Sequence, residues 1–243
     1  MCEECLAAMR PMAGGFCSIC GERLDHLYVE ATDGEARCGL CRRLEPPFVK
    51  AAAYGSYEGG LRELIHLLKY DHVRPAANVL GRMLAEAVAE LQPLWGEAPV
   101  VVVPVPLYVR KMRQRGFNQA EMITKSAMKL LRASESLELR VDVLERRRET
   151  QSQIGLSRHQ RRENMRGAFA VKDAAAIVGR EVLLVDDVFT TGTTVSECAR
   201  VLRRAGTGHV FVATVARTLK LEAQSTASRL DAETTGKSMA AAG

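Results

Sequence analysis

The chain has 243 residues, of which 47% are hydrophobic and 26% are charged, and its formal net charge at neutral pH is +5. This length suffices for one ordinary domain and a small additional module. No stretch approaches the roughly 20 apolar residues of a membrane span, and the N-terminus lacks the basic region and apolar core of a signal peptide, so we expect a cytoplasmic protein without a membrane span.

Cysteines dominate the start of the chain. Six of the seven lie in the first 41 residues, as three Cys-x-x-Cys pairs, which in a cytoplasmic protein indicate zinc rather than disulfides. Two pairs make one tetrahedral structural site, and the 17 residues between the second and third pairs are a zinc-ribbon spacing. We predict a zinc ribbon over residues 1–47 that holds one structural Zn²⁺ through Cys17, Cys20, Cys38 and Cys41, and whose folding energy the metal supplies.

The first pair, Cys2 and Cys5, forms half of a second site. These cysteines are either free thiols or ligands of a second ion that also needs residues absent from this chain. Because Met1 directly precedes the pair, we also consider that an upstream coding segment supplies another Cys-x-x-Cys.

A boundary follows at Pro46-Pro47, since proline breaks regular structure. We predict a second domain over residues 48–220. It begins with a short strand over 49–54, and apolar residues at helical spacing then predict an amphipathic helix that ends at Lys69-Tyr70. A further helix is expected from about residue 75 to 91.

The next buried strand, over residues 99–106, ends in prolines that stop the ladder and shape a loop. That loop carries four cations within the six positions 110–115. At the carboxyl end of a strand these side chains suit a pyrophosphate, with Arg offering planar forks and Lys a point charge. Asn118 is the expected cap of the helix that follows.

Positive charge is concentrated in the middle of the chain. Residues 110–166 contain 15 Lys and Arg against 7 Asp and Glu, a net of +8. Such a segment suggests an anionic partner, either a phosphorylated small ligand or nucleic acid, although solvated helix surfaces account for part of the charge. Few aromatic residues interleave the cations, which weakens the case for a stacking-type strand binder.

An apolar run over residues 182–185 leads into Asp186-Asp187 and then a Thr- and Gly-rich turn. The apolar spacing behind that turn is helical, with Gly206 as the stop. We therefore predict a buried strand of a parallel sheet, a loop and a helix N-terminus. In such sheets ligands bind beyond the carboxyl ends of the strands.

This stretch offers two kinds of chemistry. Backbone N–H groups, hydroxyls and the positive end of a helix suit a phosphate, whereas the adjacent carboxylates suit sugar hydroxyls or a hard cation. A phosphorylated sugar needs both. The alternative is a strand-end turn in which Asp and Thr only satisfy backbone donors. The anion-binding candidates are Thr190, Thr191, Gly192, Thr193 and Thr194.

A last strand is predicted over residues 209–215, and residues 221–243 have the polar, aperiodic composition of a disordered tail. The predicted fold class is α/β, a mostly parallel sheet with flanking helices preceded by a small zinc-ribbon module.

The nine residues from Asp186 to Thr194 resemble the phosphoribosyl-pyrophosphate (PRPP) loop of type I phosphoribosyltransferases. The resemblance implies that Asp186 and Asp187 hold the ribose hydroxyls and that Thr190–Thr194 cradles the 5′-phosphate. It also implies that Arg110, Lys111 and Arg115 meet the pyrophosphate, whose charge Mg²⁺ neutralises.

Other blocks are similar to the ComF family of phosphoribosyltransferase-like proteins. They are Tyr57–Tyr70, the Val-Pro-Val-Pro-Leu and Arg-Gly-Phe-Asn-Gln segments, and Thr150–Phe169. Together with the cysteines and the PRPP-like loop, the similarity spans residues 2–218. The family commonly has two knuckle pairs before Cys17, whereas this chain has one.

This resemblance implies transfer of ribose-5-phosphate from PRPP to an acceptor that the sequence does not identify, in connection with DNA uptake during natural transformation. The basic stretch over residues 144–169 is similar in place and character to the mobile loop that excludes water in type I enzymes. The alternative is a non-catalytic module that binds PRPP or single-stranded DNA beside a helicase-like competence partner.

Overall fold

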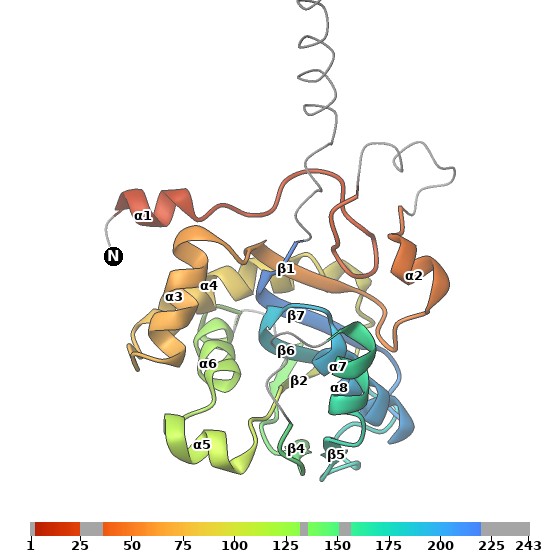
Figure 1. Ribbon diagram of the computed structural model, residues 1–243. Helices are drawn as coiled ribbons and strands as arrows, with labels where there is room; N and C mark the ends of the chain where they lie inside the picture. The colour runs from red at the N-terminus through yellow and green to blue at the C-terminus, as the bar shows by residue number, and fades with distance from the viewer. Residues whose placement is uncertain (1–2, 25–35, 132–135, 151–156, 220–243) are drawn as a thin grey trace, which may run out of the picture.

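A five-stranded sheet lies at the centre of the computed structural model, which describes residues 3–24, 36–131, 136–150 and 157–219 (Figure 1). Every strand pair in it is parallel, which confirms the predicted α/β class. In spatial order the strands are β1 (Ala51–Ser56), β7 (Val210–Arg217), β6 (Val182–Phe189), β2 (Val100–Pro104) and β3 (Leu137–Leu139).

Helices cover both faces of the sheet (Figure 1). The first face is packed against α3 (Gly59–Lys69), α4 (Ala76–Ala89) and α6 (Gln119–Leu131). The second face is packed against α8 (Thr193–Arg204). The predicted helices therefore form where the apolar spacing placed them, with a short 3-10 turn, η2 (Gln92–Leu94), after α4. Within the described residues, no helix is both long and apolar enough to cross a bilayer.

The two cores follow from the alternation of strand side chains. Leu183 and Val185 of β6 join the core under α3, α4 and α6, whereas Val182 and Leu184 join the core under α8. All four side chains are buried. The strands therefore read as continuous apolar runs because both of their faces are covered.

The predicted end of the strand at Asp186 is wrong. β6 continues through both carboxylates to Phe189, because its partner β7 runs equally far and pairs Asp186 with Thr214 and Phe189 with Arg217. The carboxylates thus lie on a hydrogen-bonded strand, and the loop begins only at Thr190.

The cation-rich segment that the sequence suggests is a loop forms a helix, α5 (Val109–Arg115). Gly116 ends it with φ 74°, and its N–H donates to the Met112 carbonyl at 2.8 Å. Asn118 caps α6 as expected, since its Oδ1 accepts from the Ala120 N–H at 3.0 Å.

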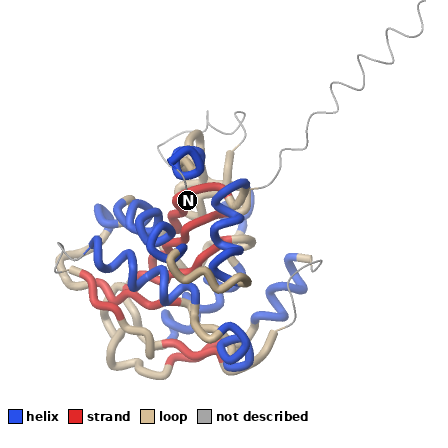
Figure 2. Tube along the Cα trace, turned by 90° about the vertical axis from the view of Figure 1, so that its left-hand side faces the viewer, coloured by secondary structure: helices blue, strands red, loops and turns tan. Residues whose placement is uncertain are grey.

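A small antiparallel pair, β4 (Leu144–Arg146) with β5 (Phe169–Val171), lies at the end of the molecule opposite the N-terminal segment (Figure 1, Figure 2). The basic helix α7 (Arg158–Met165) precedes β5 and starts with a capping box between Ser157 and Gln160. Residues 151–156 of the mobile-loop prediction and the predicted tail over 221–243 lie outside the described residues.

The N-terminal module contains α1 (Glu3–Ala8), an isolated bridge between Phe16 and Arg23, and α2 (Gly39–Arg43). It is hydrogen-bonded to the edge strand of the sheet. The Ala51 N–H donates to the Ile19 carbonyl at 2.7 Å, and the Met12 N–H donates to the Tyr54 carbonyl at 2.9 Å. The module therefore packs directly on β1.

Helices α4 and α6 approach each other closely at Gly81, where an added Cβ would lie 2.6 Å from the Cβ of Ser126. We expect Gly81→Ala to lower the free energy of unfolding by about 1–3 kcal/mol through overpacking, although alanine favours a helix over glycine by ~1 kcal/mol. Urea denaturation measures this change. Ser126→Gly in the same chain should recover most of the loss, and a more stable Gly81→Ala variant would contradict the prediction.

Candidate functional site

Asp187 is anchored by a buried ion pair. It is 4% exposed, and its Oδ2 lies 2.7 Å from Nζ of Lys69 in the last turn of α3. Burial alone would lower the pKa of Lys69, but the Asp187 carboxylate raises it above its usual value, so the lysine stays charged. Removing either partner would leave an uncompensated buried charge, and the pair therefore holds α3 against the end of β6.

Asp186 lies next in the strand, and its Oδ1 accepts a hydrogen bond from the Asp187 N–H at 2.9 Å. Burial first, and the charge of Asp187 second, raise the pKa of this carboxyl from 3.8 to about 7, although Lys69 and Arg146 act in the opposite direction. The group therefore gains and loses its proton near neutral pH. A half-buried carboxyl with such a pKa at the carboxyl end of a strand is a candidate ligand-binding group.

Arg146 of β4 faces this carboxyl. Its guanidinium lies over the Phe169 ring at 5.4 Å and donates to the Thr150 hydroxyl. Its Nε is buried without a hydrogen-bond partner among the described residues. Burial lowers the pKa of the guanidinium, and Asp186 counteracts the shift. Arg146 was not singled out in the sequence, where it reads as one of several basic residues in a polar segment.

The structure brings two of the three predicted pyrophosphate ligands toward this arginine. Burial, followed by the charges of Arg146 and Arg115, lowers the pKa of Lys111, so each of the two arginines acts on this lysine. Arg115 is held by Gln119 and lies over the Tyr70 ring at 5.6 Å. We refer to Lys111, Arg115 and Arg146 as the cation cluster.

Arg110, the third predicted pyrophosphate ligand, is exposed and is paired with Glu149. Its side chain is 66% exposed, and its Nη1 is 3.5 Å from Oε2 of Glu149. An exposed pair of this kind contributes little to stability. The structure thus puts Arg110 at the outer rim of the site.

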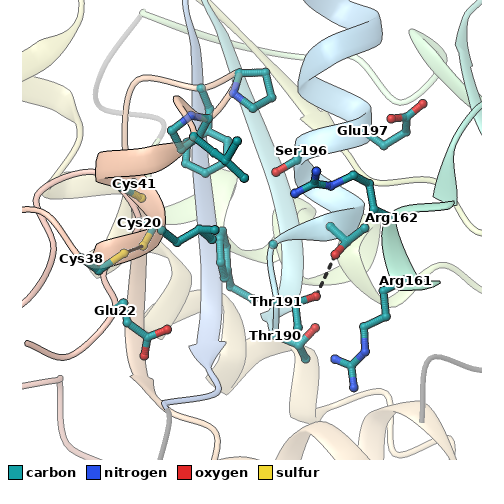
Figure 3. A pocket seen from close by; sticks show the side chains of 18 of the residues that line it. Cys20, Glu22, Cys38, Cys41, Arg161, Arg162, Thr190, Thr191, Ser196 and Glu197 are labelled. Carbon is teal, nitrogen blue, oxygen red and sulfur yellow. Dashed lines mark hydrogen bonds between the residues drawn. The ribbon is translucent and has the colours of Figure 1, made fainter. Parts of the chain in front are cut away.

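The segment Thr190–Thr194 joins β6 to α8, and Gly192 at its centre is the N-cap of the helix with φ 73°. An added Cβ at Gly192 would lie 2.6 Å from the Phe189 ring, so glycine is required here. The Thr191 and Thr193 hydroxyls are hydrogen-bonded at 2.9 Å (Figure 3). No side chain of the described residues caps this helix, and its N-terminus is suited to an anion.

The four cysteines predicted to bind zinc are gathered in one buried cluster. Their sulfur atoms all lie within 4.8 Å of one another, and Cys20 and Cys38 are 3.6 Å apart. Four thiolates around one zinc at 2.3 Å stand about 3.8 Å apart, so Cys17, Cys20, Cys38 and Cys41 fit a tetrahedral metal site.

The other predicted metal ligands are not placed. Cys2 and the side chain of Cys5 lie outside the described residues, and of this pair the structure gives only the backbone of Cys5 in α1.

Arg217, the last residue of β7, connects the cysteine cluster to the loop before α8. It is 3% exposed, and its Nη2 lies 3.8 Å from the sulfur of Cys20 and 3.2 Å from Oε2 of Glu22. Its guanidinium also covers the Phe189 ring at 4.4 Å. The contact between Arg217 and Cys20 could not be predicted from the sequence, because the two residues are far apart in the chain and are brought together only by folding.

A cavity of about 380 Å³ opens between the cysteine module, the Thr190–Thr193 segment and α7 (Figure 3). Its size is that of a small-molecule site. The side chains on the cysteine module are mostly apolar, whereas α7 and α8 contribute arginines and hydroxyls. Asp186, Asp187 and the cation cluster do not line it.

Comparisons with known proteins give a consistent result. A family model described as "Phosphoribosyl transferase domain" matches residues 123–237. The DNA utilization protein YhgH of Escherichia coli K12 is 32% identical over 227 residues, which are 90% of this chain and 97% of that protein. Competence protein F of Haemophilus influenzae is 30% identical over 224 residues, with 89% and 96% covered.

More distant similarities are also found. Competence protein ComFC of Bacillus subtilis is 23% identical over 206 residues, which cover 85% of this chain and 79% of that protein. Among solved structures, a hypoxanthine phosphoribosyltransferase from Staphylococcus aureus superposes with a TM-score of 0.38 at 16% identity, covering 60% of this chain and 69% of that one.

The raised pKa of Asp186 predicts a pH-dependent stability. The folded carboxyl holds its proton between about pH 4 and 7, where the unfolded chain has released it, so stability falls as the pH rises through this window. Asp186→Asn removes the effect. The quantity of interest is the free energy of unfolding of Asp186→Asn minus that of the unmodified chain. We expect this difference to be on the order of 2 kcal/mol larger at pH 8 than at pH 5. Urea denaturation at both pH values measures it, and Asp142→Asn at an exposed carboxyl should show no rise.

The cysteine cluster predicts a metal-dependent fold. We expect the purified chain to carry one zinc ion, and the Cys20→Ser, Cys38→Ser double variant to lose the ion and several kcal/mol of stability. Elemental analysis and thermal denaturation measure these changes. Cys198→Ala, at a buried thiol outside the cluster, should keep the metal. An unchanged zinc content in the double variant would show that these cysteines are not the ligands.

Proposed function

The chain belongs to the ComF family of phosphoribosyltransferase-like proteins, and on that premise we propose that it binds PRPP with Mg²⁺ and transfers the ribose-5-phosphate unit to an acceptor. The observation that carries the proposal is a juxtaposition at one edge of the parallel sheet. Two carboxylates of β6, an anion-suited helix N-terminus and the cation cluster lie around the ends of neighbouring strands. A sugar with phosphates at both ends needs these three groups.

In this proposal the donor lies along the ends of β6 and β2. Asp186 and Asp187 accept hydrogen bonds from the ribose hydroxyls, and the ion pair with Lys69 holds the side chain of Asp187 in place. The Thr190–Thr194 segment receives the 5′-phosphate through backbone N–H groups and hydroxyls. Because Asp186 and Asp187 belong to a paired strand, the ribose would be held by a rigid element.

The pyrophosphate end meets the cation cluster. Lys111 and Arg115 approach it from α5, and Arg146 approaches from β4, where its unpartnered Nε supplies a further donor. Arg110 acts from the rim. Mg²⁺, when bound with PRPP, adds charge neutralisation at the leaving pyrophosphate.

The proposed reaction is a substitution at C1 of the ribose. The C1–O bond to pyrophosphate breaks, its electron pair leaves with the pyrophosphate, and the ribose ring carries positive charge in the transition state. The cation cluster stabilises the leaving group, and the carboxylate of Asp186 lies near the developing positive charge. No side chain is assigned as a general base, so catalysis rests on positioning and electrostatics.

The relatives named for DNA utilization and competence support a cellular role in handling DNA that the cell has taken up, within the cytoplasm. A second candidate function is a non-catalytic module that binds single-stranded DNA together with a helicase-like partner. The exposed arginines near α7 favour it: the side chains of Arg147 and Arg166 are 63% and 78% exposed. Binding of this kind weakens steeply with salt.

The enzyme proposal predicts a specific loss. We expect the Asp186→Asn, Asp187→Asn double variant to bind PRPP at least about 100-fold more weakly in the presence of Mg²⁺, because it loses two charge-assisted contacts of about 1.5–3 kcal/mol each. Isothermal titration calorimetry measures the affinity, with Asp142→Asn as the control. Unchanged PRPP affinity in the double variant would rule out the proposed donor site. Affinity for a single-stranded oligonucleotide should survive both substitutions.

A companion variant tests the same site without touching the buried ion pair. Lys111→Ala with Arg115→Ala should weaken PRPP binding about tenfold or more and leave the affinity for ribose 5-phosphate unchanged, because that ligand lacks the pyrophosphate. Equal losses for both ligands would assign these cations a different role.

A further inference from the structure

The cavity beside the donor site shares the Thr190–Thr193 segment with the proposed 5′-phosphate site, and the rest of it has no role in the function proposed above. We propose that it binds the acceptor, and that the acceptor is a nucleotide, a planar nitrogen heterocycle that carries its own phosphate. This inference rests on the proposed donor site, and three features of the cavity support it: its position, its apolar wall and its charged wall.

The position follows from the stereochemistry of PRPP. Its pyrophosphate leaves from the α face of the ribose, whereas the 5′-phosphate arm lies on the β face. A substitution that inverts C1 requires the acceptor to enter from the face opposite the leaving group, which is the face of the 5′-phosphate. The cavity shares Thr190, Thr191, Gly192 and Thr193 with the phosphate loop, and the cation cluster does not line it. It therefore lies on the side from which the acceptor must come.

The wall on the side of the cysteine module is mostly apolar, although Glu22 and Glu45 also belong to it. Leu44, Pro47 and Phe48 line it, and Phe48 packs edge-on against Phe189 with ring centroids 6.2 Å apart. The guanidinium of Arg217 lies over the Phe189 ring at 4.4 Å and helps to hold it in place. A planar heterocycle packs well on such a surface.

With a divalent ion bound, the four thiolates of the cysteine module would carry a net negative charge, which disfavours an anion at that wall. The opposite wall differs. Arg162 of α7 extends over Ser196 of α8 (Figure 3), and within the described part of the chain it has no carboxylate partner. Arg200 and Arg217 are already paired, with Glu197 and Glu22. A phosphate on the acceptor would therefore contact Arg162 and the Ser196 hydroxyl.

In the resulting reaction a ring nitrogen of the heterocycle forms a bond to C1 as the C1–O bond to pyrophosphate breaks. The electron pair of the broken bond leaves with the pyrophosphate. A nitrogen that carries a proton releases it to water at the mouth of the cavity. No oxidant or other reactant is needed.

Two substitutions test the site, each with a matched control. Leu44→Trp fills the cavity from the apolar wall, and Leu94→Trp adds the same bulk at a leucine that is equally exposed, both being at 47%. Arg162→Ala removes a cation of the charged wall, and Arg203→Ala removes an exposed arginine of α8 that lies outside the cavity.

The measurement is isothermal titration calorimetry of AMP into the full chain, with the donor site first saturated with ribose 5-phosphate, a ligand that cannot react. We expect AMP to bind, adenine and inorganic phosphate to bind at least tenfold more weakly, and Leu44→Trp and Arg162→Ala each to weaken AMP binding at least tenfold. Both control variants should behave like the unmodified chain. A 5′-phosphorylated oligodeoxyadenylate that binds as tightly as AMP would identify the end of a strand as the source of the nucleotide.

Several outcomes would overturn the inference. One is that ribose 5-phosphate and AMP compete for a single site. Another is that the test and control substitutions have equal effects on AMP binding. A third is that a chain that binds ribose 5-phosphate does not bind AMP. A chain that binds neither ribose 5-phosphate nor PRPP would instead refute the proposed donor site, so the two failures are distinguishable.

Discussion

The parallel pairing of β6 on both of its sides is the constraint on which the site depends. β2 and β7 fix its register, and β7 extends far enough to hold the strand straight through Asp186 and Asp187. Since neighbouring side chains on a strand face opposite ways, one carboxylate reaches Lys69 under α3, and the other faces Arg146. A single strand thus presents two carboxylates in different surroundings. Asp187 is paired with Lys69, whereas burial and the charge of Asp187 raise the pKa of Asp186 to about 7.

The spacing of apolar residues and cysteines predicted those elements whose formation depends on residues close together in the sequence. The apolar runs of β2 and β6 and the helical spacing behind Gly192 predict the elements that form, and the cysteine spacing predicts a cluster that the structure confirms. The strand end at Asp186 was wrong because it depends on the length of β7, a partner distant in the sequence. Likewise, residues 110–115 were predicted to form a loop because of their many cations. They form a helix instead, and Gly116 ends it.

Site residues supplied by tertiary contacts were beyond this kind of prediction. Lys69 reads as an ordinary lysine in the last turn of a helix, a common position for a cation. Its ion pair exists only because α3 packs beside the end of β6. Arg146 and Arg217 were missed for the same reason, since each becomes distinctive through a buried neighbour that lies far along the chain. The carboxylates and the Thr-rich loop could be singled out as candidate site residues because they are contiguous in the sequence.

Arg217 gives the metal module a role in the site that goes beyond folding. Its guanidinium is shared among a thiolate ligand, the Glu22 carboxylate and the Phe189 ring, and Phe189 is the last strand residue before the phosphate-suited loop. Hydrogen bonds to metal ligands orient the ligands, and here the same donor also orients the neighbouring aromatic ring. Because Gly192 packs within contact of that ring, a shift of the cysteine cluster would be transmitted through two side chains to the N-terminus of α8. The cysteine module is therefore one wall of the cavity beside this loop.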